Sequence, residues 1–246
     1  MAKIAFVMQD YESQQLLNEY LLMHYGTSEE RMPWTLGGIG DLDFVSRTVE
    51  FFTQKRVNLS LDLGCAVGRS SFLLSKTSDK VIGVDFSQSF IDAANQMKDR
   101  GQVAYEIKEE ADRSVDAIAH IPEGVASEKV SFAQGDALNL PSGFKGFDRV
   151  HASNLLCRLP DPMLFLDRLP QLVKTAGEVV LATPFTWLEQ YTPKEHWPEG
   201  DSWEWLQAIM GEHFILKQET DEPFLIREHA RKFQLGVSKI SVWRRK

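Results

Sequence analysis

The chain has 246 residues, a net charge of −8 and 43% hydrophobic residues. That length suits one α/β domain with additions better than two complete domains. The acidic balance argues against a nucleic-acid substrate, which needs a basic surface, and favours a small molecule or a protein. Cys65 and Cys157 lack the spacing of a disulfide framework or a metal site. We therefore expect a reduced, cytoplasmic protein with no bound metal.

Two helices are predicted near the N-terminus, after a start that has no secretory signal. Residues 12–25 place apolar side chains at helical spacing, and Gly26 ends this helix. After a glycine-rich loop at 32–40, Asp41 can cap a second helix. No stretch of the chain approaches the ~18 apolar residues that a membrane-spanning helix needs. We therefore expect no membrane association.

Residues 58–85 have the order strand, glycine turn, helix and strand that nucleotide-binding α/β domains use. The small residues of the turn, from Gly64 to Gly68, let the backbone approach a ligand closely. Asp85 ends the second strand about 20 residues past the first glycine, where an acid can accept ribose hydroxyls. A dinucleotide fingerprint needs a middle glycine, but this turn has Ala66, which disfavours an NAD-dependent oxidoreductase.

This pattern resembles the first motif of class I S-adenosylmethionine (SAM) methyltransferases. In that family the turn packs on the methionine part of SAM, an acid such as Asp85 holds the ribose, and an acid after the third strand meets the adenine amino group. Gly135-Asp136-Ala137 follows the predicted strand at 130–134 and supplies that third feature. The predicted cofactor-binding residues are Asp62, Gly64, Cys65, Ala66, Gly68, Asp85, Phe86, Asp136, Ala137 and Asn154. The resemblance implies an α/β Rossmann-like fold with a mostly parallel seven-stranded sheet flanked by helices.

The middle of the chain adds a helix, an insertion and a fourth strand. Ser87 can cap a helix whose apolar pattern extends to about Tyr105. The charged segment 108–129 is predicted to be a solvated insertion. A strand at 147–152 then leads to Asn154, which would lie where ligands meet the carboxyl ends of parallel strands. Alternatively, Asn154 is a turn residue that bonds its own backbone.

The C-terminal third contains a helix at 163–173, a strand at 178–182 and an aromatic loop. The loop carries Trp187, Glu189 and Tyr191. Aromatic rings beside a carboxylate suit a small, partly cationic heterocycle better than a polymer. Two closing strands are predicted at residues 214–219 and 233–243.

Several longer segments resemble the methyltransferase of ovothiol biosynthesis, which often forms the C-terminal part of a larger sulfoxide synthase. They comprise residues 20–26, 61–71, 152–162, 183–193 and 226–234. The resemblance implies that SAM is used to methylate the π imidazole nitrogen of 5-thiohistidine (4-mercaptohistidine), which gives ovothiol A, and that the chain is a freestanding final enzyme. Cys157 departs from the family pattern, which has Asp there in many members.

The resemblance also implies that residues 1–56 form a helical lid and residues 57–246 the core of a single domain. Tyr25 would then face the substrate, or else pack in the core as we expect for Tyr20. The catalytic candidates are Tyr25, Asn154 and His24, and the substrate-binding candidates are Tyr25, Arg158, Trp187, Glu189, Tyr191, Arg227 and Arg231.

An amino-acid substrate needs a cation for its carboxylate, and Arg158, Arg227 and Arg231 are the alternatives. Its ammonium group needs an acceptor, for which Glu189 and Asn154 are options. His24, Tyr25 or Tyr191 could favour the uncharged π nitrogen. Two other functions stay open, namely methylation of a different small molecule and SAM binding without catalysis. The sequence leaves the oligomeric state open.

Overall fold

The structure is a computed structural model that describes residues 11–35 and 42–246. Three predicted features lie wholly or mostly outside the described residues. They are the cap Asp41, the glycine-rich loop and the start of the chain that has no secretory signal. No helix among the described residues is long and apolar enough to cross a membrane.

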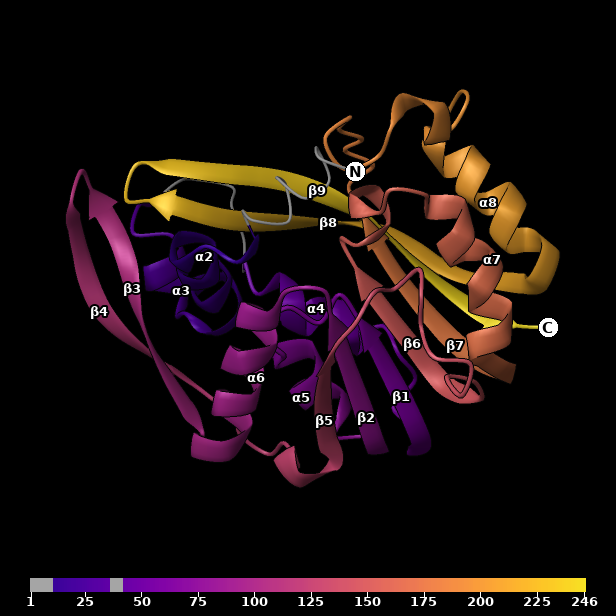
Figure 1. Cartoon of the computed structure of the whole chain (residues 1–246), viewed down its shortest axis with the longest axis horizontal. Helices are drawn as coiled ribbons and strands as arrows, with labels where there is room; N and C mark the ends of the chain where they lie inside the picture. Colours follow the sequence, from indigo (N-terminus) through magenta and orange to yellow (C-terminus); the bar gives the residue numbers. More distant parts are fainter. Residues whose placement is uncertain (1–10, 36–41) are drawn as a thin grey trace.

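A seven-stranded sheet forms the centre of the molecule (Figure 1). In spatial order its strands are β5 (Val130–Gln134), β2 (Ser78–Asp85), β1 (Val57–Leu63), β6 (Phe147–Ser153), β7 (Val173–Thr183), β9 (Lys232–Arg245) and β8 (Phe214–His229). The first five are mutually parallel, and β9 is antiparallel to both of its neighbours. The predicted mostly parallel, seven-stranded α/β fold is therefore confirmed.

Alternate residues of the central strands face two separate hydrophobic cores. Val180 belongs to the core that contains α2 (Gln14–Tyr25), α4 (Phe44–Glu50), α5 (Arg69–Leu74) and α6 (Gln88–Arg100). Its neighbour Val179 belongs to the core that contains α7 (Pro162–Leu172) and α8 (Ser202–His213). Because successive side chains of a strand point to opposite faces, helices cover both faces of the sheet.

Local signals set several helix ends, although not always those that the sequence predicts. Asp43, and not the predicted Asp41, caps α4 by accepting a hydrogen bond from the Ser46 amide at 3.3 Å. The Ser87 hydroxyl accepts a hydrogen bond from the Phe90 amide at 3.1 Å and caps α6. The predicted extension of this helix to Tyr105 is wrong. Gly101 ends α6 in the left-handed conformation (φ 72°), which residues with a side chain rarely adopt.

The segment after Gly101 is a β-hairpin, β3 (Gln102–Glu110) and β4 (Arg113–His120). In β3 every second residue from Val103 to Ile107 is buried, so the pattern there has the period of a strand. Most of β4 is exposed, and the 3-10 helix η1 (Ser127–Lys129) follows it before β5.

The hairpin of β8 and β9 is longer than predicted and projects beyond the rest of the sheet (Figure 1). Its outer part and the β3–β4 hairpin lie on either side of α2 and α3 (Ser28–Arg31) (Figure 1). Phe224 of β8 packs against Phe44 of α4, with ring centroids 5.4 Å apart. The projecting part of β8 therefore helps to hold the N-terminal helices over the sheet.

Candidate active site

A cavity of about 250 Å³ lies at the carboxyl ends of all five parallel strands. The wall formed by these strand ends, which we call the cofactor wall, contains Gly64, Ala66, Asp85, Phe86, Gly135, Asp136, Ala137, Ser153 and Asn154. The opposite wall, which we call the substrate wall, contains Tyr11, Tyr20, Met23, His24, Phe44, Val45, Thr48, Arg158, Gln190, Tyr191, Phe224 and Ile226. Parallel α/β sheets bind ligands at this edge because the loops leaving their strands meet there.

Asp85 fixes the geometry of the cofactor wall. Its carboxylate accepts hydrogen bonds from the backbone amides of Ala66, at 2.8 Å, and Ser87, at 2.9 Å. Burial raises the pKa of Asp85 to about 6, although these donors oppose the shift. Ala66 lies in the left-handed region (φ 47°), so the glycine-loop backbone is turned toward the carboxylate. The predicted acid and the predicted turn therefore form one unit.

Asp62 lies behind the turn and does not line the cavity. The hydroxyls of Ser70 and Ser71 each donate to one carboxylate oxygen at 2.6 Å, and Nδ1 of His151 lies 2.8 Å from the other. Nε2 of His151 lies 3.1 Å from the Thr48 hydroxyl. Burial raises the pKa of Asp62, but the bonds to His151 and the two serines outweigh burial and hold it below its usual value. This network joins β1, β6, α5 and α4.

Cys65 and Gly68 are also behind the cavity wall. Cys65 is fully buried, and burial raises the pKa of its thiol. A Cβ atom on Gly68 would lie 2.6 Å from the Phe132 ring, and the backbone there has φ 87°. Gly68 therefore allows the first turn of α5 to pack against β5, which is a structural requirement of the motif.

The remaining predicted cofactor residues line the cavity. Phe86 is 45% exposed, and the exposed Asp136 accepts a hydrogen bond from the Leu138 amide at 2.9 Å. Asn154 is a turn residue, as one interpretation predicts, but its side chain bonds another strand and not its own backbone. It lies in a left-handed turn (φ 54°) and lines the cavity, where its side-chain oxygen accepts a hydrogen bond from the Ser238 hydroxyl at 2.7 Å.

His24 and Tyr25, two catalytic candidates on α2, have different surroundings. The Tyr25 hydroxyl donates to the Val67 carbonyl at 2.8 Å, and Tyr25 does not line the cavity. His24 does line it, and its buried Nδ1 has no hydrogen-bond partner among the described residues. Burial and the nearby Arg69 lower the pKa of His24 to about 3. His24 is therefore a neutral imidazole, while Tyr25 supports the glycine turn.

Arg158 and Tyr191 lie together on the substrate wall. The Arg158 guanidinium, at the end of the 3-10 helix η2 (Leu156–Arg158), stands 4.6 Å from the centre of the Tyr191 ring. The Tyr11 ring lies 6.3 Å from Tyr191 and 6.4 Å from Tyr20. Tyr20 therefore contributes to the cavity as well as to the core that we predicted for it.

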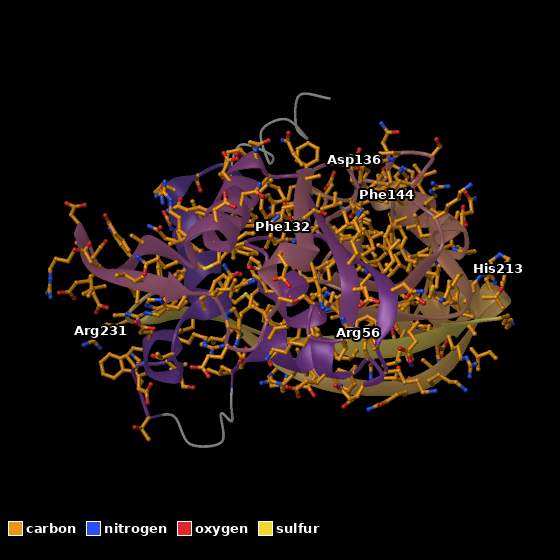
Figure 2. All side chains as sticks on the ribbon, turned by 90° about the horizontal axis from the view of Figure 1, so that it is seen from below. Arg56, Phe132, Asp136, Phe144, His213 and Arg231 are labelled. Carbon is orange, nitrogen blue, oxygen red and sulfur yellow. The ribbon has the colours of Figure 1, made fainter. Side chains whose placement is uncertain are left out.

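Besides Tyr25, four predicted substrate residues lie outside the cavity. The Trp187 indole donates to the Ser202 hydroxyl at 3.0 Å, and the exposed Glu189 lies 3.7 Å from Lys194. The buried Arg227 donates to the Glu109 carboxylate and to the Glu30 carbonyl, at 2.7 and 2.6 Å. Arg231 stacks on Trp34 at 4.9 Å, at one end of the molecule and away from Asp136 (Figure 2). We therefore do not assign substrate contacts to these four residues.

The sequence reasoning missed several residues of the cavity. His151 is buried in β6 directly opposite Asp62 of β1, and a histidine inside an apolar strand was a usable signal. Phe44 and Phe224 had no such signal, because aromatic residues on a helix and a strand usually indicate a core. Only their packing against each other brings them to the cavity.

Comparisons with known proteins agree with this geometry. Residues 61–181 match the family described as a methyltransferase domain. The demethylmenaquinone methyltransferase of Oceanobacillus iheyensis is 29% identical over 136 residues, which cover 52% of this chain and 47% of that protein. The chain spans about half the length of the curated relatives it matches.

Solved structures share the fold at low sequence identity. The [4+2]-cyclase SpnF has a TM-score of 0.61 and 14% identity, covering 97% of this chain and 95% of its own. A SAM-dependent methyltransferase from Methanosarcina mazei has a TM-score of 0.54 and 15% identity, covering 80% and 95%. The fold is that of the class I methyltransferases. SAM is the cofactor, and the turn, the acids after β2 and β5 and the cavity between them fit it.

Proposed function

We propose that this chain, whose residues 61–181 are a SAM-dependent methyltransferase domain, transfers the methyl group of SAM to the π nitrogen of 5-thiohistidine. The observation that carries the proposal is the composition of the substrate wall. Mostly aromatic and aliphatic side chains there surround the neutral imidazole of His24 and one guanidinium, Arg158. The second imidazole of the cavity, His151, is already bonded to Asp62 and Thr48. An imidazole amino acid offers complementary groups, namely a flat ring, a ring N–H and a carboxylate.

The cofactor wall would hold SAM in a defined orientation. Asp85 would accept the ribose hydroxyls, Asp136 would meet the adenine amino group, and the turn at Gly64 would contact the methionine part. Asn154 would then lie beside the reacting methyl group. Bound SAM supplies an electrophilic methyl group on a sulfonium, so the protein has mainly to align the acceptor nitrogen and exclude water.

His24 is suited to fix the tautomer of the acceptor ring. Because its pKa is about 3, it is neutral near pH 7 and has one nitrogen free to accept a hydrogen bond. If it accepts the N–H of the ring nitrogen that is not methylated, the lone pair of the π nitrogen is left to attack the methyl group. The proton of the π nitrogen leaves to solvent before transfer, and the C–S bond of SAM breaks as the N–C bond forms.

Methylation of a different small molecule is the second candidate. Phe44, Val45, Phe224 and Ile226 give the substrate wall an apolar part that would also accept an uncharged ring. The matched relatives named as demethylmenaquinone methyltransferases support a ring of that kind. A substrate without a carboxylate would leave Arg158 without a role in binding.

The test is a competition between acceptors. The purified protein would be incubated with SAM and equal amounts of 5-thiohistidine, histidine and a short-chain demethylated quinol, and each product would be located by NMR. We expect a single product with its new methyl group on the π nitrogen of thiohistidine. Equal turnover of histidine, methylation at sulfur or preference for the quinol would contradict the proposal. Absence of S-adenosylhomocysteine with every acceptor would favour a non-catalytic SAM-binding module.

A further inference from the structure

Arg158 is the one Arg or Lys side chain among the described residues that lines the cavity. Its Nη1 atom donates to the carbonyl oxygens of Cys157 and Thr186, both at 3.2 Å, and lies 3.5 Å from the Cys157 sulfur. No carboxylate within residues 11–35 and 42–246 forms an ion pair with it. This half-buried guanidinium at the cavity wall thus keeps donors that no side chain among the described residues uses.

The groups nearest to Arg158 do not neutralise its charge. Tyr191 presents its ring to the guanidinium, and Tyr11 and Tyr20 lie beyond it. Burial raises the pKa of Tyr20 to about 12 and the pKa of Tyr11 well above its usual value, so both phenols are uncharged near pH 7. The acids that line the cavity, Asp85 and Asp136, belong to the cofactor wall.

The other two arginines of the sequence prediction are committed elsewhere. Arg227 is buried against Glu109, and Arg231 stacks on Trp34 outside the cavity. Only Arg158 of the three can therefore reach a ligand in the cavity. A planar guanidinium binds a carboxylate through two parallel hydrogen bonds, and a stacked aromatic ring holds the guanidinium plane in place.

We propose that Arg158, stacked on Tyr191, is a carboxylate-binding subsite that selects substrates carrying an α-carboxylate. The subsite deepens the proposed function and rests on it only for the identity of the acid. Two ligands could supply a carboxylate, the substrate and the methionine part of SAM. The substrate is favoured because Arg158 and Tyr191 follow β6 and β7, whereas the glycine turn for the methionine part follows β1.

The test compares acids with their decarboxylated amines. Protein saturated with S-adenosylhomocysteine would be titrated calorimetrically with 5-thiohistidine and its amine, and with histidine and histamine. The variants are Arg158→Gln, Arg158→Lys and the control Arg231→Gln. Arg158→Lys keeps the positive charge but loses the planar guanidinium that can form two parallel hydrogen bonds. Melting temperatures would show which variants are folded, and separate titrations would give the affinity of each for S-adenosylhomocysteine.

We expect the wild type and Arg231→Gln to bind the acid of at least one pair about 10- to 100-fold more tightly than its amine, the scale of charge-assisted hydrogen bonds. Arg158→Gln should abolish this preference and Arg158→Lys should reduce it, with S-adenosylhomocysteine affinity within about twofold of wild type.

Three results would overturn the subsite. The first is a wild type that binds acids and amines equally well, and the second is a folded Arg158→Gln that still prefers the acids. The third is an Arg158→Gln variant that loses affinity only for S-adenosylhomocysteine, which would assign Arg158 to the cofactor. If Arg158→Gln does not fold, an unchanged preference in Arg158→Lys has the same consequence. An acid preference without methyl transfer to thiohistidine would contradict the proposed function and leave the subsite standing.

Discussion

The two walls of the cavity are built in different ways. The cofactor wall comes from short connections after parallel strands, and Asp85 ties it together through two backbone amides. The substrate wall is assembled from α2, α4, η2, strand β8 and the loop that follows β7. The comparison teaches that a wall made of loop backbone is set by local sequence, whereas a wall made of side chains depends on how distant elements pack.

The largest expected effect is on the network that joins the two walls. Asp62→Asn removes the charge that holds His151, Ser70 and Ser71, and His151 also reaches Thr48 of α4. We expect a loss of about 3–5 kcal/mol in the free energy of unfolding, because three hydrogen bonds to a buried carboxylate lose the charge of their acceptor. Urea denaturation measures it. Asp136→Asn, which changes an exposed acid, is the control and should cost less than about 0.5 kcal/mol.

A second prediction concerns the pH dependence of the free energy of unfolding, to which His24 of the substrate wall contributes. The pKa of His24 is about 3 in the folded chain, against about 6.5 when unfolded, so the unfolded state takes up its proton first as pH falls. Stability should therefore decrease below about pH 6.5, by up to about 1.4 kcal/mol per pH unit from this group. Asp85, whose pKa is raised to about 6, contributes with the opposite sign.

The difference between wild type and His24→Phe isolates the histidine contribution to this pH dependence. Urea denaturation at pH 4.5, 5.5 and 7 should show a shallower decline in the variant. Parallel declines in the two proteins would mean that His24 is not held neutral by burial.

The cofactor wall should respond mainly through binding. Asp85→Ala is expected to weaken S-adenosylhomocysteine binding by about 1–3 kcal/mol, because the ribose hydroxyls lose their acceptor and Ala66 and Ser87 lose theirs. Isothermal titration calorimetry gives the value. Asp92→Ala, which removes an exposed acid from α6, provides the matched comparison. Equal affinities of the two variants for S-adenosylhomocysteine would show that Asp85 does not contribute to cofactor binding.

His24→Phe should slow methyl transfer while leaving the cofactor wall intact. We expect kcat/KM for thiohistidine to fall roughly 10- to 100-fold, because the ring tautomer is no longer selected. Affinity for S-adenosylhomocysteine should stay within about twofold. His24→Asn keeps an acceptor oxygen and should recover part of the rate. Full activity of the phenylalanine variant would rule out this role.

The smallest effect is expected at Glu189, one of the predicted substrate residues that lie outside both walls. Glu189 is exposed and pairs with Lys194. Glu189→Gln should change stability by less than about 0.5 kcal/mol and leave KM for thiohistidine within about twofold, since surface ion pairs contribute little. A large rise in KM would mean that the loop after β7 closes onto the substrate.

The prediction of the fold succeeded where the signal was local. The strand of Leu61 and Leu63, the turn from Gly64 to Gly68 and the acid Asp85 lie within one short segment, and each has its own periodicity or spacing. It failed beyond Gly101, where one apolar pattern was assigned to a helix although alternate residues of a strand fit it better. A helix and a strand that are both half-buried differ little over a few residues.

Residues close together in the sequence predict the parallel sheet, the glycine turn and the acids beside it, and the resemblance that they carry implies the cofactor. Arg158, Arg227 and Arg231 look alike in the sequence, and only folding distinguishes them. One lines the cavity, one is buried against Glu109 and one stacks on Trp34. What a charged side chain can bind depends on the partners that folding brings to it, and those partners come from distant parts of the chain.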